Sequence, residues 1–164
     1  MRLQIKELTH PKDGYKIKFD KLIDIDPLFK HRDDNRNRDF CVYFIYDGVG
    51  RLVYIGEGIY YSILKYTIKE FLKSRAFNHK QNSRGTELVA SNFEINWSIQ
   101  IVASGLTKIE SVVLESYFIR EELKKGQKLS SRGAKEWDRD SLMNKNKGRS
   151  DKVYSDLRRE YLNV

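Results

Sequence analysis

The sequence has a single cysteine, Cys41, among its 164 residues. One thiol cannot form an intramolecular disulfide, and without a second cysteine the chain has neither a CxxC pair nor a zinc knuckle. We therefore expect a protein of a reducing compartment. In that setting Cys41 is expected to be a small buried apolar residue of a strand rather than a nucleophile.

Long apolar runs are also missing. No stretch approaches the roughly 18 apolar residues of a membrane span, and the first residues, MRLQIKELTHPKDG, lack the apolar segment of a secretory signal. Secretion and membrane spanning are therefore not expected. We expect a cytoplasmic protein with no membrane partner.

An excess of acidic residues is the third absence. Lys and Arg number 31 against 23 Asp and Glu, which gives a formal net charge of +8. An excess of positive charge attracts polyanions, of which nucleic acids are the commonest. A basic soluble protein without such a partner is the alternative that charge alone leaves open. The length fits one domain, so we expect residues 1–164 to form a single core.

The stretch from Cys41 to Glu57, CVYFIYDGVGRLVYIGE, predicts a β-hairpin. Two apolar, aromatic-rich runs, 42–46 and 52–55, flank a turn-forming segment with two glycines. Because side chains alternate along a strand, the hydroxyls of Tyr43 and Tyr54 can point into one pocket. Two core tyrosines with no further task are the alternative.

The remaining patterns predict a strand at 15–19, an amphipathic helix at 59–80, a strand at 92–101, a helix from a capping box at 107 to Gly126, a loop at 126–148 and a closing helix at 151–162. The third strand beside the hairpin gives a sheet large enough to be stable. We therefore predict an α/β (α+β) fold with a small central three-stranded antiparallel sheet flanked by helices.

Two predicted helices carry polar residues of interest. Arg75 and His79 lie four residues apart and would share one helical face. Glu115 lies in the most apolar part of its helix, where a carboxylate is costly unless it is paired or binds a cation. Solvent exposure of the Arg75 and His79 pair, and an ion pair between Glu115 and a Lys or Arg, are the alternatives.

In this order the residues resemble the GIY-YIG nucleases, whose hairpin reads Gly-Ile-Tyr, about ten residues, then Tyr-Ile-Gly. Tyr54-Ile55-Gly56 is intact, whereas Cys41-Val42-Tyr43 keeps the tyrosine and lacks the glycine. The resemblance covers about 41–146. It implies the catalytic set Tyr43, Tyr54, Arg75, His79, Glu115 and Asn144, with Asn146 as an alternative to Asn144.

The arginine departs from the family spacing. The usual register, about ten residues after the second tyrosine, gives Leu64 or Lys65 here. Either the helix carries an insertion, or Lys65 replaces the arginine. Arg75 is preferred because only it brings a histidine four residues later.

The resemblance implies a metal-dependent endonuclease that hydrolyses phosphodiester bonds of double-stranded DNA, with one Mg²⁺ (or Mn²⁺) held by Glu115. Within the family, a type II restriction endonuclease is expected, with residues 1–40 as an N-terminal extension, 41–146 as the catalytic core and 147–164 as the C-terminal helix. Of the two phenols, Tyr43 is expected to be the more demanding, in that its loss should reduce activity more, because it would act as the general base or pass a proton to the general base. A second copy of the chain is a candidate partner.

Other functions stay open. They are a structure-specific repair nuclease, a mobile-element nuclease, a catalytically inactive nucleic-acid-binding module and an interaction protein with a basic surface.

Overall fold

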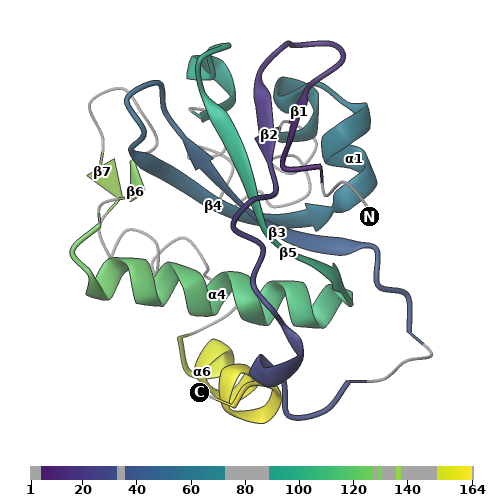
Figure 1. The fold of residues 1–164 in the computed structure, drawn as a ribbon. Helices are drawn as coiled ribbons and strands as arrows, with labels where there is room; N and C mark the ends of the chain where they lie inside the picture. Colours follow the sequence, from purple (N-terminus) through teal and green to yellow (C-terminus); the bar gives the residue numbers. More distant parts are fainter. Residues whose placement is uncertain are drawn as a thin grey trace.

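The computed structural model describes residues 5–32, 36–72, 89–127, 129–130, 136–137 and 151–163. Its α+β fold is a mixed five-stranded sheet with helices on both faces (Figure 1). In chain order the elements are β1 (Glu7–Thr9), β2 (Lys16–Lys18), the 3-10 helix η1 (Asp26–Leu28), β3 (Phe40–Tyr46), β4 (Leu52–Ile59), α1 (Tyr60–Lys65), β5 (Ser98–Leu106), α4 (Lys108–Lys124), β6 (Leu129–Ser130), β7 (Glu136–Trp137) and α6 (Asp151–Tyr161).

The sheet is larger than predicted. Its strand order is β1-β2-β5-β3-β4, and β3 pairs antiparallel with both β4 and β5. These three strands are the antiparallel unit that the sequence predicts. The correction is that β2 adds to β5 in parallel and β1 adds to β2. The N-terminal residues are therefore part of the sheet, because Ile17 of β2 pairs with Ile99 and is buried in the core.

The predicted hairpin is confirmed as β3 and β4. The carboxylate of Asp47 accepts hydrogen bonds from the backbone N–H groups of Val49 and Arg51, and this closes the turn. Gly50 has φ +85°, a conformation that glycine adopts without steric cost.

The strand predicted at 92–101 is wrong in its first half. Residues 95–96 form a turn, and β5 begins at Ser98. Phe93 and Trp97 are buried with their rings 5.4 Å apart, while Ile95 between them is exposed. The apolar alternation here comes from a turn that places two aromatic rings together, not from a pleated strand.

The helix predicted at 59–80 is interrupted. α1 ends at Lys65, and Tyr66 is extended with ψ 153°. Thr67 and Glu70 then start a second helical stretch, 68–72, because each side chain accepts a hydrogen bond from the backbone N–H of the other. The T-x-x-E pattern in the sequence signals this start. Residues 73–88 lie outside the described part of the chain.

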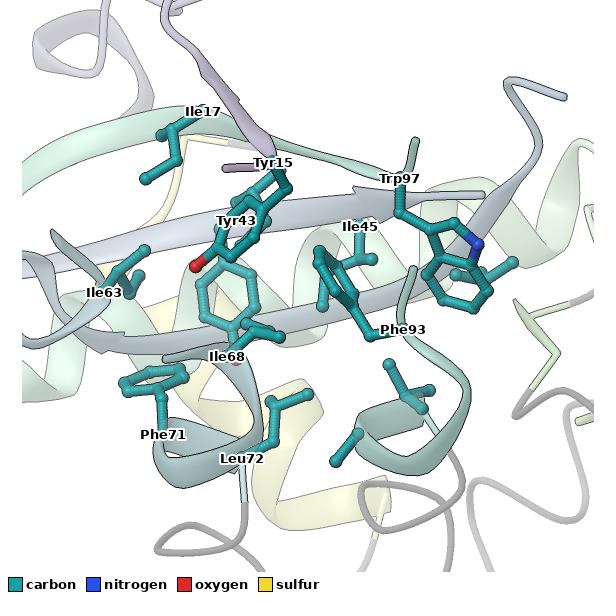
Figure 2. Close-up of a cluster of buried hydrophobic side chains, with 14 of the residues drawn as sticks. Tyr15, Ile17, Tyr43, Ile45, Ile63, Ile68, Phe71, Leu72, Phe93 and Trp97 are labelled. Atoms are coloured by element: carbon teal, nitrogen blue, oxygen red, sulfur yellow. The ribbon is translucent and has the colours of Figure 1, made fainter. Parts of the chain in front are cut away.

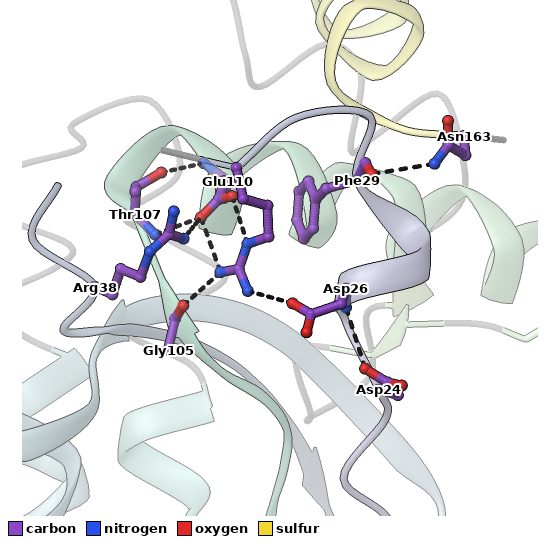
Figure 3. A network of polar contacts seen from close by, with 9 residues as sticks. Asp24, Asp26, Phe29, Arg38, Gly105, Thr107, Glu110 and Asn163 are labelled. Atoms are coloured by element: carbon purple, nitrogen blue, oxygen red, sulfur yellow. Dashed lines mark hydrogen bonds and ion pairs between the residues drawn. The ribbon is translucent and has the colours of Figure 1, made fainter. Parts of the chain in front are cut away.

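Helix α4 begins as predicted, with a capping box between Thr107 and Glu110. Glu110 is buried and also accepts hydrogen bonds from Arg32 and Arg38, which lie between η1 and β3 (Figure 3). Burial alone would raise the pKa of Glu110. The hydrogen bond from Arg32, the backbone N–H of Thr107 and the two guanidinium charges outweigh burial and lower this pKa below its ordinary value.

Two other predictions concern the C-terminal third. The segment predicted as a loop contains the short antiparallel pair of β6 and β7, and the predicted closing helix is confirmed as α6. After α6, the Asn163 side chain donates to the carbonyl oxygens of Pro27 and Phe29, so the end of the chain is tied to the N-terminal segment. Within the described ranges, none of the helices combines the length and the apolar character needed to cross a lipid bilayer.

The sheet separates two apolar clusters. Cluster A contains α1 and the residues near it, and cluster B contains the apolar sides of α4 and α6. The buried members of cluster A are Tyr15, Ile17, Cys41, Tyr43, Ile45, Val53, Ile63, Ile68, Phe71, Leu72, Val89, Ala90, Phe93, Trp97, Ile99 and Ile101. The burial of Cys41 agrees with its predicted role as a small apolar residue.

Candidate active site

The two tyrosines of the hairpin lie on the same face of the sheet. Tyr43 is directly opposite Gly56 in the register of β3 and β4, and Tyr54 is opposite Ile45. The rings of Tyr43 and Tyr54 are 6.2 Å apart between centroids and inclined by 29°. Both rings pack in cluster A, as the alternation along the hairpin predicts.

Gly56 makes this arrangement possible. A Cβ atom at this position would lie 2.5 Å from Cζ of Tyr43 and 2.7 Å from Cε1 of Tyr54. Both distances are far below van der Waals contact, so a side chain at 56 would displace the two rings. The last residue of Tyr54-Ile55-Gly56 therefore has a local steric reason to be glycine.

Phe71 supports Tyr43 from the helical stretch after α1. Their ring centroids are 5.7 Å apart in an edge-on arrangement, and Figure 2 shows both rings within cluster A. Phe71 also lies over Gly58, where an added Cβ would be 2.7 Å from its Cζ. Two glycines of β4 thus leave space for three aromatic rings, those of Tyr43 and Tyr54 at Gly56 and that of Phe71 at Gly58.

The two tyrosines differ in access to solvent. Tyr43 is 0% exposed, and Tyr54, on the outer strand of the sheet, is partly exposed. A group that exchanges protons with a bound water has to reach that water. Of the two, Tyr54 is thus the tyrosine that solvent reaches, whereas the sequence led us to expect the more demanding role at Tyr43.

Glu115 is partly exposed on α4. The neighbouring α4 residues Val113 and Leu114 are buried in cluster B, on the opposite face from the tyrosines. The structure therefore brings Tyr43 and Tyr54 together and places Glu115 on the helix behind the sheet. β4 is the outer strand of the sheet, so its outer edge, which carries Tyr54, borders both the cluster A face and the cluster B face.

Of the other predicted site residues, only Lys65 lies in the described part of the chain. Arg75, His79 and Asn144, with its alternative Asn146, lie outside the described residues. Lys65, the alternative to Arg75, is exposed at the end of α1, where its Nζ lies 5.3 Å from the ring centroid of Tyr66.

Sequence reasoning missed a buried carboxylate next to the hairpin glycine. Glu57 is 2% exposed, and its oxygens accept hydrogen bonds from Nζ of Lys108 at 2.8 Å and Oγ of Ser111 at 3.1 Å. Glu57 pairs with Val42 on the cluster B face, so it joins β4 to the start of α4. The sequence carried a signal for this burial, because residue 57 lies two positions after apolar Ile55 and therefore on the same face of the predicted strand.

Among the described residues, no three His, Cys, Asp or Glu side chains gather into a group that could hold a metal ion. One groove there is lined by Arg36, Phe40, Lys108 and Leu157 among others, and none of the predicted site residues contributes to it.

Comparisons with known proteins add no relative. No protein-family model matches the sequence, and no curated protein and no solved structure matches it.

Proposed function

We propose that the protein is a metal-dependent DNA endonuclease that hydrolyses phosphodiester bonds and resembles the GIY-YIG nucleases, with type II restriction as its role. The observation that supports this best is the packing of Tyr43, Tyr54 and Gly56. The three residues that carry the resemblance lie together on one face, and Gly56 provides the space for both rings. A chance similarity of sequence would not require the three residues to pack against one another in this way.

Glu115 is the proposed metal ligand. A partly exposed carboxylate suits a hard cation such as Mg²⁺, which keeps several of its waters and needs few protein ligands. When bound, Mg²⁺ or Mn²⁺ would supply charge stabilisation for the phosphate and the leaving oxygen. Glu57 is less suitable, because its carboxylate is already bound by Lys108 and Ser111.

The remaining roles follow from side-chain chemistry. The hydroxyl of Tyr54 would orient the attacking water and take part in proton transfer, and Tyr43 would hold the ring of Tyr54 in place. By resemblance, the Arg75 guanidinium would donate to the non-bridging phosphate oxygens, with His79 and Asn144 beside it.

Double-stranded DNA is the proposed partner, and the cytoplasm the proposed location. The net charge of +8 favours association with a polyanion. Self-association as a homodimer is part of the same proposal, since a symmetric enzyme can act on both strands of a symmetric site.

A second candidate function is a catalytically inactive nucleic-acid-binding module. Two observations favour it: Tyr43 is fully buried, and Cys41 stands where the family has glycine. In such a module the tyrosines would be core residues and only the basic surface would act.

Incubation of the full chain with supercoiled plasmid tests the two candidates. We expect cleavage with Mg²⁺ and none with EDTA. Glu115→Gln should lower the rate by about two orders of magnitude or more, the scale for losing a group that stabilises the transition state. Glu121→Gln, on the same helix but in a surface pair with Lys124, is the matched control and should cleave normally. Binding without cleavage by the wild-type protein would favour the inactive module.

A further inference from the structure

Two tyrosines of the chain project into solvent. Tyr61 of α1 is 66% exposed and Tyr66, directly after α1, is 41% exposed. The other eight tyrosines are buried or partly buried. Tyrosine rings exposed in this way lose the packing that stabilises them elsewhere in the chain, and exposed aromatic side chains are enriched at binding surfaces.

A lysine connects the two rings. Tyr61 and Lys65 are four residues apart and both exposed, so they share one face of α1. Nζ of Lys65 lies 5.3 Å from the ring centroid of Tyr66. Lys65 thus shares a helix face with Tyr61 and lies over the ring of Tyr66, and we name Tyr61, Lys65 and Tyr66 the α1 row.

The α1 row is attached to a firm base. Ile63 of α1 is buried, and the carbonyl oxygen of Tyr66 accepts a hydrogen bond from Nε2 of His10 at 2.9 Å. Two residues later, the backbone N–H of Ile68 donates to the carboxylate of Asp13. The turn between β1 and β2 therefore fixes the backbone beneath the row, so that less backbone entropy is lost on binding.

The surroundings of the row are basic. Lys69 is exposed in the helical stretch 68–72, and Lys12 is close enough to Glu70 to lower the pKa of that carboxyl, after the larger effect of the hydrogen bonds from Thr67. Three lysines thus stand against two carboxylates, Glu70 and Asp13, which already accept hydrogen bonds from Thr67 and Ile68. A partner for this surface has to carry negative charge and planar faces.

We infer that the α1 row binds unpaired bases of a nucleic acid, with Tyr61 and Tyr66 stacking on bases and Lys65 and Lys69 contacting phosphates. In a duplex the base faces are covered by their neighbours, whereas in a single strand every base offers a face to an aromatic ring. The row lies on the α1 side of the sheet, where Tyr54 packs. This inference rests on the proposed function and makes it more specific: the double-stranded DNA substrate offers unpaired bases of a locally opened segment to the α1 row.

Fluorescence anisotropy in EDTA, with a labelled thymidine oligonucleotide and a duplex of equal length, tests this without cleavage. We expect the full chain to bind the single strand more tightly. Tyr61→Ala should weaken single-strand binding about tenfold and leave duplex binding nearly unchanged, whereas Tyr61→Phe, which keeps the ring, should bind like the wild type.

Charge is tested separately. Lys65→Gln should reduce the slope of log affinity against log salt by about 0.7 on the single strand. The control, Lys152→Gln, removes an exposed lysine from α6 on the other face and should leave this slope unchanged. An unchanged urea midpoint in each variant establishes that the fold is intact.

Two results would overturn the inference: wild-type affinity in Tyr61→Ala, or equal losses on single strand and duplex. If the wild-type chain cleaves duplex plasmid and either result is found, the inference alone fails. If the single-strand effects hold but no plasmid is cleaved with Mg²⁺, the proposed nuclease activity fails and the inference stands. A chain that binds no nucleic acid overturns both.

Discussion

The ring of Tyr43 lies over Gly56, its direct partner in the hairpin, so closely that no other side chain fits at position 56. The same glycine leaves space for the ring of Tyr54. The glycine of Tyr54-Ile55-Gly56 is therefore required by the packing of the two tyrosine rings. It also gives a test of the geometry that does not depend on any activity.

Gly56→Ala should destabilise the protein by about 1–3 kcal/mol, the usual cost of forcing extra volume into a packed core. Gly56 is in a strand and has no positive φ, so the cost would come from the clash and not from the backbone. Urea unfolding measures it. In a Tyr43→Ala background the same substitution should cost less than half as much, and an undiminished cost would show that Tyr43 is not the obstacle.

Tyr54→Phe should lower the cleavage rate more than Tyr43→Phe, if the protein is the proposed nuclease. The loss at Tyr54 is expected to be about two orders of magnitude, the scale of general acid–base catalysis, because Tyr54 is the phenol that solvent reaches. Tyr43→Phe keeps the buried ring and should cost about tenfold or less. Single-turnover cleavage of plasmid gives both rates. Equal and mild losses would mean that neither phenol activates the water.

His10→Ala should destabilise the protein by about 2 kcal/mol, the scale for leaving buried polar groups unpaired. Nδ1 of the buried ring accepts the backbone N–H groups of Lys12 and Asp13, so the proton is on Nε2, which donates to the carbonyl oxygen of Tyr66. Hydrogen exchange at residues 66–72 should become faster. His31→Ala, at an exposed histidine, is the control and should change stability by no more than about 0.5 kcal/mol. Equal stability of the two variants would show that the hydrogen bonds of His10 do not stabilise the fold.

Acid should weaken the protein partly through Glu110. The folded state lowers the pKa of Glu110 below its ordinary 4.5, so this carboxylate contributes full stability above that pH, and the contribution is lost as pH falls through the lower folded value. Glu110→Gln keeps the capping box but removes the buried charge that Arg32 and Arg38 share. It should cost about 2 kcal/mol near neutral pH and less in acid. Urea unfolding across pH measures both, and a cost independent of pH would contradict this account.

Local patterns in the sequence were enough for the elements whose cause is local. The hairpin follows from two apolar runs around a turn, and the start of α4 follows from the Thr107 and Glu110 capping box. The position of Tyr43 and Tyr54 on one face follows from strand alternation together with the register of the hairpin. The break after Lys65 was also encoded locally, by Thr67 and Glu70, but the apolar spacing of the longer segment obscured it.

Other features depend on residues far apart in the chain. The parallel pairing of β2 with β5 joins Ile17 to Ile99, and no local period encodes which strand another will meet. Burial depends on the same assembly. Tyr43 is enclosed because Phe71 and its neighbours cover it, Glu110 is buried because Arg32 and Arg38 compensate its charge, and Glu115 lies behind the sheet because α4 packs there. Residue types and their alternation along one strand are properties of the sequence itself. The access of a side chain to solvent, and the position of Tyr54 at the outer edge of β4, are decided only when the sheet and both helical layers have assembled.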